Sequence, residues 1–155
     1  MFTEIRDITA FNKQEILALC IADNQQHFIE TTSQCLAEAE RDRHFTPLGL
    51  YKDNTAVGFA MYGVFPHDDH SQRIWLDRYL IDERYQKQGL GKYFLQQLIH
   101  YLTVQFNCQH IYLSVYDNNA VAIRLYQQFG FIFNGELDDK GEKVMVLEVH
   151  RHDNH

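Results

Sequence analysis

Hydrophobic and polar positions repeat with two different periods along this chain, and the two periods predict both strands and helices. Alternating segments rich in β-branched and aromatic residues predict strands at 2–8, 48–51, 56–64, 74–81, 110–116, 131–136 and 143–149. Apolar residues at helical spacing predict helices at 12–22, 31–41, 89–106 and 120–129. The order β-α-α-β-β-β-α-β-α-β-β predicts an α/β fold, with a mixed sheet flanked by helices in a single domain over residues 1–150.

Cap and turn residues set some of the expected boundaries. Asn12, with Glu15 three positions later, predicts a capped start of the first helix. The pair Asp53-Asn54 predicts a tight hairpin between two strands. Gly58, inside the second of these strands, indicates a bulge or a close approach of another backbone.

Composition narrows the classes of function. The 155 residues have a formal net charge of −7, which argues against a nucleic-acid partner because phosphate binding needs a basic face. No apolar run approaches the roughly 18 residues of a membrane span, and the N-terminus lacks a signal peptide's pattern, so we expect a cytoplasmic protein without a membrane partner. The three cysteines form no CxxC pair, and we expect no metal site from them. Residues 151–155 are expected to be a disordered tail, with metal binding by its histidines as the alternative.

The stretch 86–91, Gln-Lys-Gln-Gly-Leu-Gly, lies between a predicted strand and a predicted long helix. A glycine-bearing turn of this kind directs unpaired backbone N–H groups and the positive end of the helix dipole at one point, where a phosphate or pyrophosphate can bind. Arg84, Lys87 and Lys92 add positive charge nearby. The residues expected at this anion site are Gln86, Lys87, Gln88, Gly89, Leu90, Gly91 and Lys92.

Two common phosphate motifs do not fit this stretch. A Walker A loop needs Gly at 86 and Ser or Thr at 93, where the chain has Gln86 and Tyr93. A dinucleotide fingerprint needs a small residue at Phe94 and an acidic one near Ile111. The remaining pattern, Gln-x-x-Gly-x-Gly, resembles the acetyl-CoA pyrophosphate loop of GNAT N-acetyltransferases.

A second motif makes this resemblance specific. The sequence Asn119-x-x-Ala122-x-x-x-Tyr126-x-x-x-Gly130-Phe131 is similar to the helix that follows the fifth strand in GNAT enzymes. The resemblance implies a splayed GNAT sheet and acetyl-CoA as co-substrate. Residues 86–92 would hold the pyrophosphate of acetyl-CoA, and Asn119 would contact its pantetheine arm. The resemblance also implies a possible homodimer, which is common in the superfamily. Further contacts to the arm would come from the backbone of Tyr79, Leu80 and Ile81.

The same resemblance implies two catalytic residues. Tyr126 would be a general acid that reprotonates the leaving thiolate, and the alternative is a core aromatic residue. Asp77 matches the acidic residue that acts as base in polyamine N-acetyltransferases, often through water. The alternative for Asp77 is an ion pair with Arg78 or Arg73.

The expected acceptor is a small polycation such as spermidine or spermine. Segments that resemble bacterial spermidine/spermine acetyltransferases include 28–30, 36–39, 47–51 and 57–59. In the superfamily the first two helices usually form the acceptor wall, and residues 23–42 are rich in carboxylates here. Phe28, Glu30 and Glu38 are the candidate substrate-binding residues, although a solvated helical face would look the same. An aminoglycoside or other small-amine acetyltransferase, or an acetyl-CoA-binding regulator without turnover, remains the alternative.

Overall fold

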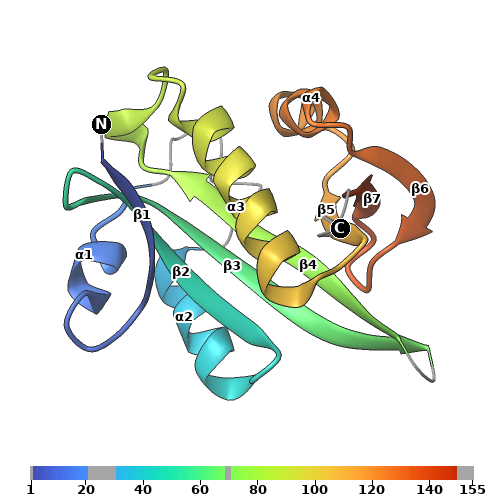
Figure 1. The fold of residues 1–155 in the computed structure, drawn as a ribbon, viewed down its shortest axis with the longest axis horizontal. Coiled ribbons are helices and arrows are strands. Elements are labelled where there is room, and N and C mark those ends of the chain that lie inside the picture. The colour runs from blue at the N-terminus through green and yellow to red at the C-terminus, as the bar shows by residue number, and fades with distance from the viewer. Residues whose placement is uncertain (1, 21–30, 69–70, 150–155) are drawn as a thin grey trace, which may run out of the picture. The chain divides into compact units, whose positions relative to one another are not determined.

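The computed structural model describes residues 2–20, 31–68 and 71–149. Its helices and strands are β1 Thr3–Asp7, α1 Lys13–Leu17, α2 Thr32–Arg41, β2 Phe45–Lys52, β3 Thr55–Asp68, β4 Ser71–Ile81, α3 Leu90–Phe106, β5 His110–Val115, α4 Ala120–Gln128, β6 Ile132–Leu137 and β7 Lys143–Glu148 (Figure 1). A short 3-10 turn, η2 Glu83–Tyr85, separates β4 from α3. The predicted element order is confirmed.

The strands form one mixed sheet of seven, in the order β1-β2-β3-β4-β5-β7-β6. Strands β4 and β5 are parallel, whereas the β1–β2, β2–β3, β5–β7 and β6–β7 pairs are antiparallel. Contacts divide the chain into two compact units, one of Met1–Gly63 with Leu76–Phe94 and the other of Val64–Trp75 with Leu95–His155.

In the first unit, α1 and α2 cover one face of β2 and β3. Figure 1 shows the two helices beside β1 and β2, in blue and cyan. Ile16 of α1 and Cys35 of α2 are fully buried against Tyr51, Phe59 and Met61 of the strands. The apolar stripes that predicted these helices are therefore the faces that build the core.

In the second unit, β7 lies between β5 and β6. The buried residues alternate along β5 (Ile111, Leu113 and Val115), as the period of two predicted. The edge strand β6 is largely exposed, including Ile132 and Leu137.

Two turn predictions are confirmed in detail. Asp53 and Asn54 have positive φ angles of 49° and 67°, the conformation of a type I′ hairpin. At Gly58, an added Cβ would lie 2.7 Å from the carbonyl oxygen of Leu80, so the β4 backbone approaches too closely for any side chain. Both interpretations of Gly58 are therefore observed, because the β2–β3 register also shifts beside it, between the Leu50–Gly58 and Tyr51–Ala56 pairs.

The first helix is shorter than predicted. Helix α1 ends at Leu17, and residues 18–20 are not helical. The reason lies at Cys20, whose backbone N–H donates to Asp82 (2.8 Å) and whose carbonyl accepts from the N–H of Glu83 (3.0 Å). Because both backbone groups of Cys20 are engaged by the η2 turn, they are not available to continue the helix.

Asn12 is the N-cap residue of α1, as predicted, but the predicted capping box is absent. Asn12 makes no side-chain cap bond, because its Oδ1 accepts from the N–H of Thr9 (2.7 Å). Glu15 accepts from the buried hydroxyl of Tyr51 (2.8 Å) instead of closing a capping box. Helix α2, by contrast, starts with a complete capping box formed by Thr31 and Gln34.

None of the helices in the described part of the chain is long and apolar enough to span a membrane.

Candidate functional site

The loop between β4 and α3 has the geometry of an anion site. Lys87 and Gly89 have positive φ angles of 64° and 80°, which turn the chain from η2 into the helix. The first α3 bond runs from the N–H of Tyr93 to the carbonyl of Gly89 (3.1 Å), so the N–H groups of Leu90, Gly91 and Lys92 precede the intrahelical ladder. The first turn of α3 has no acidic residue to occupy them.

The two glycines of the loop have different roles. Gly89 is required by its left-handed backbone conformation. Gly91 has no such requirement, and a Cβ at either glycine would meet no protein atom within 4 Å. The empty space at Gly91 is what a ligand needs to reach the backbone, and the residues present therefore fit the pyrophosphate of a coenzyme A thioester.

Side chains hold this loop to the end of β4. The hydroxyl of Tyr79 donates to the carbonyl of Gly91 (2.5 Å). The side-chain amide of Gln86 donates to the carbonyl of Ile81 (3.0 Å). Gln86, expected at the anion site, thus shapes the loop, and one lone pair of the Ile81 carbonyl is already used.

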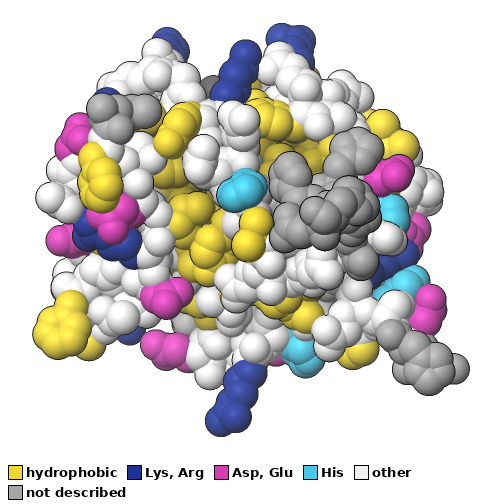
Figure 2. Space-filling model, viewed as in Figure 1, with side chains coloured by type: hydrophobic (Ala, Val, Ile, Leu, Met, Phe, Trp, Pro, Cys, Tyr) yellow, Lys and Arg dark blue, Asp and Glu magenta, His cyan; other side chains and the backbone are white. Residues whose placement is uncertain are grey.

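The basic residues around the loop are not equivalent. The guanidinium of Arg84 is paired with Asp82, with Nε and Oδ1 2.9 Å apart, so its charge is matched inside the protein. Among the described residues, Lys87 and Lys92 form no ion pair with a carboxylate, and both are exposed. On the face in Figure 2, the described Lys and Arg side chains mostly stand apart from one another. Lys87 and Lys92 are therefore the cations available to a phosphate at this loop.

The strand that leads to the loop is paired with β5 over a short stretch. Among the described residues, the parallel β4–β5 ladder joins Ile74 to Ile111 and Trp75 to Tyr112. Strand β4 continues to Ile81. Residues 79–81, predicted to bind the pantetheine arm through their backbone, lie beyond this ladder.

Asp77 meets Arg78, one of the two partners proposed as its alternative. Their side chains approach to 3.5 Å and are 18% and 11% exposed. Arg78 also reaches Glu38 of α2 at 3.4 Å, with Glu38 33% exposed. Arg73 pairs elsewhere, with Glu136 at 2.9 Å. The structure thus brings the predicted base and one predicted acceptor residue to the same guanidinium.

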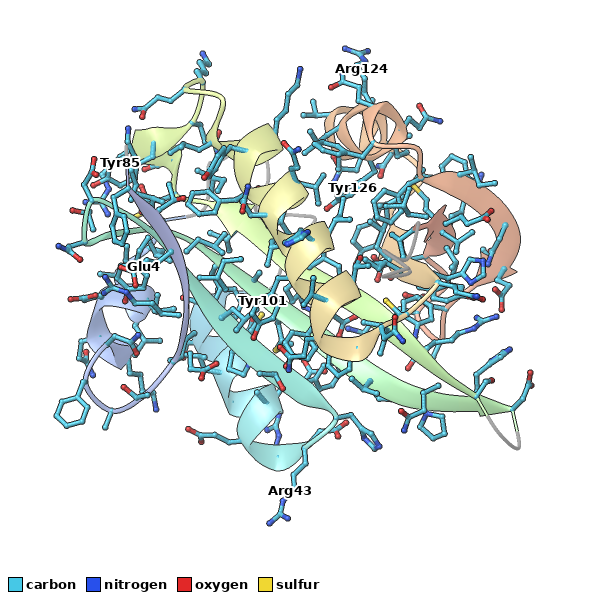
Figure 3. The ribbon with its side chains drawn as sticks, viewed as in Figure 1. Glu4, Arg43, Tyr85, Tyr101, Arg124 and Tyr126 are labelled. Atoms are coloured by element: carbon cyan, nitrogen blue, oxygen red, sulfur yellow. The ribbon has the colours of Figure 1, made fainter. Side chains whose placement is uncertain are left out.

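Tyr126 lies on α4, where Figure 3 shows it pointing away from the side on which Arg124 extends. The ring of Tyr126 packs edge-on against Phe131, with centroids 5.7 Å apart. Burial raises the pKa of the Tyr126 phenol to about 12. Tyr126 is half-buried as a residue, and within the described residues its hydroxyl makes no hydrogen bond to the protein. The hydroxyl is therefore open to solvent or to a ligand.

The remaining candidates divide into those that the structure places and those that it does not describe. Asn119 is the N-cap of α4: it is buried, and its side chain accepts from the N–H of Ala122 (3.4 Å). Gln88 is exposed in the loop. Phe28 and Glu30 lie outside the described residues. Sequence reasoning missed the anchoring roles of the Arg78 guanidinium and the Tyr79 hydroxyl, since both depend on contacts with distant segments.

Comparisons with known proteins give the family and the fold of this chain. The acetyltransferase (GNAT) family model matches residues 8–131. The chain is 51% identical, over 96% of its length and 100% of the relative's, to the spermine/spermidine N(1)-acetyltransferase of Bacillus subtilis. The fold is similar to that of the aminoglycoside acetyltransferase AAC(6')-Ib in complex with coenzyme A, with a TM-score of 0.75 at 17% identity, covering 95% of each chain. It is also similar to a PaiA N-acetyltransferase of Thermoplasma acidophilum in complex with coenzyme A, with a TM-score of 0.67 at 16% identity, covering 96% of this chain and 100% of the other.

Proposed function

Because this chain belongs to the GNAT acetyltransferase family, we propose that it transfers the acetyl group of acetyl-CoA to a primary amine of spermidine or spermine. The full-length similarity to the Bacillus subtilis enzyme is the observation that carries the choice of acceptor. The carboxylates of Asp77 and Glu38, which lie near one guanidinium, support a cationic acceptor.

The donor would bind at the loop between β4 and α3. The backbone N–H groups at the start of α3 would hold the pyrophosphate, with Lys87 and Lys92 adding charge. The backbone of Tyr79, Leu80 and Ile81 would bind the pantetheine arm as a neighbouring strand would, and Asn119 would contact it from the start of α4. Acetyl-CoA supplies the activated acetyl thioester.

The chain's own residues would move the protons. The amine nitrogen forms a bond to the acetyl carbon while the carbon–sulfur bond breaks. Asp77, directly or through a water, would take the proton that the acceptor ammonium must lose before attack. Tyr126 would donate its phenolic proton to the leaving sulfur, and the second proton lost by the nitrogen as the amide forms would restore the phenol. The raised pKa keeps this phenol protonated at neutral pH, although it makes the phenol a weaker acid than a free tyrosine.

Release of free thiol from acetyl-CoA with a panel of amines tests this function. The panel compares spermidine and spermine with a monoamine of similar length and with an aminoglycoside. We expect turnover with the polyamines at the highest kcat/KM. A preference for the aminoglycoside would reassign the acceptor, and thiol release with none of the amines despite coenzyme A binding would indicate a regulator.

A further inference from the structure

Asp82 is a buried carboxylate that the proposed reaction does not use. It follows β4 directly, and its exposed fraction is 0%. Its Oδ1 accepts from the backbone N–H of Arg84 (2.8 Å) and from the Nε of the same residue (2.9 Å). Its Oδ2 accepts from Nη2 of Arg84 (3.0 Å) and from the backbone N–H of Cys20 (2.8 Å). Both carboxylate oxygens are therefore engaged twice.

These bonds keep Asp82 ionised and unavailable as a proton acceptor. Burial by itself would raise the pKa of Asp82, but the hydrogen bonds from Arg84 and from the backbone of Cys20 outweigh it and hold the pKa below its usual range. A carboxylate in this state binds groups in fixed positions and does not exchange protons near neutral pH.

The backbone around Asp82 ties the same point to two distant segments. The N–H of Asp82 donates to the carbonyl of Val57 in β3 (2.8 Å), and the N–H of Glu83 donates to the carbonyl of Cys20 (3.0 Å). The N–H of Tyr85 then closes the η2 turn on the carbonyl of Asp82 (2.9 Å). Three backbone hydrogen bonds therefore fix the η2 turn immediately before the anion loop begins.

Arg84 extends this fixed point towards the loop. Its guanidinium is gripped at two atoms by the two oxygens of Asp82, while its side chain remains 59% exposed. The guanidinium also lies over the ring of Tyr85, which Figure 3 labels, 5.6 Å from the centroid. These contacts hold η2, the turn from which the chain enters the loop at Gln86, and their side chains have no part in the proposed chemistry.

We propose that Asp82 is a positioning residue for the acyl donor: through Arg84 and Cys20 it holds the loop 86–91 in its anion-binding conformation before acetyl-CoA arrives. The inference rests on the proposed donor site and extends it to a residue outside the loop. A preformed site binds more tightly because the ordering cost is not met at the moment of binding. The loss of Asp82 should therefore weaken recognition of the phosphates and leave the acetyl group and the acceptor unaffected.

The test compares two donors, acetyl-CoA and S-acetylpantetheine, which carries the same thioester but no pyrophosphate. Asp82→Asn keeps the volume of the side chain but replaces one acceptor oxygen by an NH₂ group that faces donors. We expect kcat/KM with acetyl-CoA to fall about tenfold or more, the value of a charge-assisted hydrogen bond, while kcat/KM with S-acetylpantetheine is unchanged. Equal losses with both donors, or no loss with acetyl-CoA, would overturn the proposal.

Glu83→Gln is the matched control. It removes the same charge at the neighbouring position, from an exposed side chain that makes none of the bonds above. We expect both donors to react with it as with the unaltered protein.

A second variant covers the case in which Asp82→Asn does not fold. Arg84→Lys keeps the positive charge on an exposed side chain but loses the two-point grip on Asp82. Arg84→Lys should show the same selective loss of kcat/KM with acetyl-CoA. An unchanged kcat/KM with acetyl-CoA would contradict the proposal. Calorimetry with coenzyme A measures the donor arm without any acceptor, so an error in the acceptor assignment does not affect this result.

Discussion

Asp77 and Asp82 lie close together in the sequence, yet their surroundings are opposite. Asp82 has no exposed surface and accepts four hydrogen bonds of 2.8–3.0 Å. Asp77 keeps 18% of its side chain exposed and meets Arg78 at 3.5 Å, and Arg78 reaches Glu38 at 3.4 Å. The donor side is thus built from saturated contacts, whereas the Asp77 side is built from longer ion pairs.

The difference indicates a division of labour between the two regions. Short, buried bonds preorganise a site for one invariant ligand, here the pyrophosphate of the donor. The two ion pairs of Arg78 are long, at 3.5 Å and 3.4 Å, so a cationic acceptor with shorter contacts can compete with Arg78 for the carboxylates. Substitutions around Asp82 should therefore affect recognition of the donor, and substitutions around Arg78 and Glu38 should affect recognition of the acceptor. Substitutions of the proton-transfer residues should lower turnover without changing either recognition step.

The largest effect is expected at Tyr126. Tyr126→Phe removes the proposed acid and should lower kcat by about 10²–10⁴-fold, the usual contribution of general acid–base catalysis, with both KM values nearly unchanged. Steady-state kinetics measure this, with Tyr101→Phe on α3, labelled in Figure 3, as the control. A rate close to that of the unaltered protein would make Tyr126 a core residue.

The pH profile tests the same residue independently. Because burial raises the pKa of Tyr126 to about 12, the phenol keeps its proton throughout the neutral and mildly alkaline range. The rate should therefore show no descending limb from Tyr126 until the pH approaches 12. The stability that this raised pKa contributes should be complete below the ordinary tyrosine value of about 10 and lost as the pH rises above it. A fall in rate near pH 9 that Tyr126→Phe abolishes would contradict this.

A smaller loss is expected at Asp77. Asp77→Asn should lower kcat/KM about 10²-fold, at the low end for a general base, since an amide can still orient a water. The loss should shrink at high pH, because more of the amine is then already neutral. A pH–rate profile measured with spermidine checks this. A uniform loss at every pH would leave Asp77 a structural partner of Arg78.

At the donor loop, Gly91 offers a cleaner test than Gly89, whose positive φ makes any substitution strained. Gly91→Asp places a carboxylate in the first turn of α3, where it stabilises the helix but repels the pyrophosphate. Its affinity for coenzyme A should be about tenfold lower than that of Gly91→Asn, which has the same shape without the charge. Calorimetry of the two variants gives the ratio. Equal affinities would place the phosphates elsewhere.

The smallest effect is expected on the acceptor side. Glu38→Gln should raise KM for spermidine about two- to fivefold, as for an exposed ion pair, and raise it less for a monoamine. Glu40→Gln on the same helix is the control, because Glu40 pairs with Lys13 at 3.3 Å and is 70% exposed. High salt should reduce the Glu38 effect by screening. Equal changes for the monoamine and the polyamine would contradict an acceptor role for Glu38.

The parts of the site that could be predicted from the sequence are local in the chain. The strand–glycine–helix element depends on residues a few positions apart, and it is confirmed. Periodicity also predicted the core faces of β5 and α2, because burial follows one face of a regular element.

The missed features depend on contacts between distant segments. The end of α1 is set by Asp82, and the environment of Asp77 by an arginine that also reaches Glu38. Glu15 closes no capping box for the same reason, since it is engaged by Tyr51, whereas Asn12 is engaged locally by the N–H of Thr9. Local propensity describes which contacts a residue can make, but tertiary partners decide which contact it does make.

The bond between Cys20 and Asp82 has a consequence for the order of folding. It joins residues 62 positions apart, and closing so long a loop is an entropically costly, late event unless the intervening strands form first. The donor loop can therefore reach its final shape only after β1 to β4 have assembled around it. In a refolding experiment, recovery of coenzyme A binding should lag behind the recovery of secondary structure.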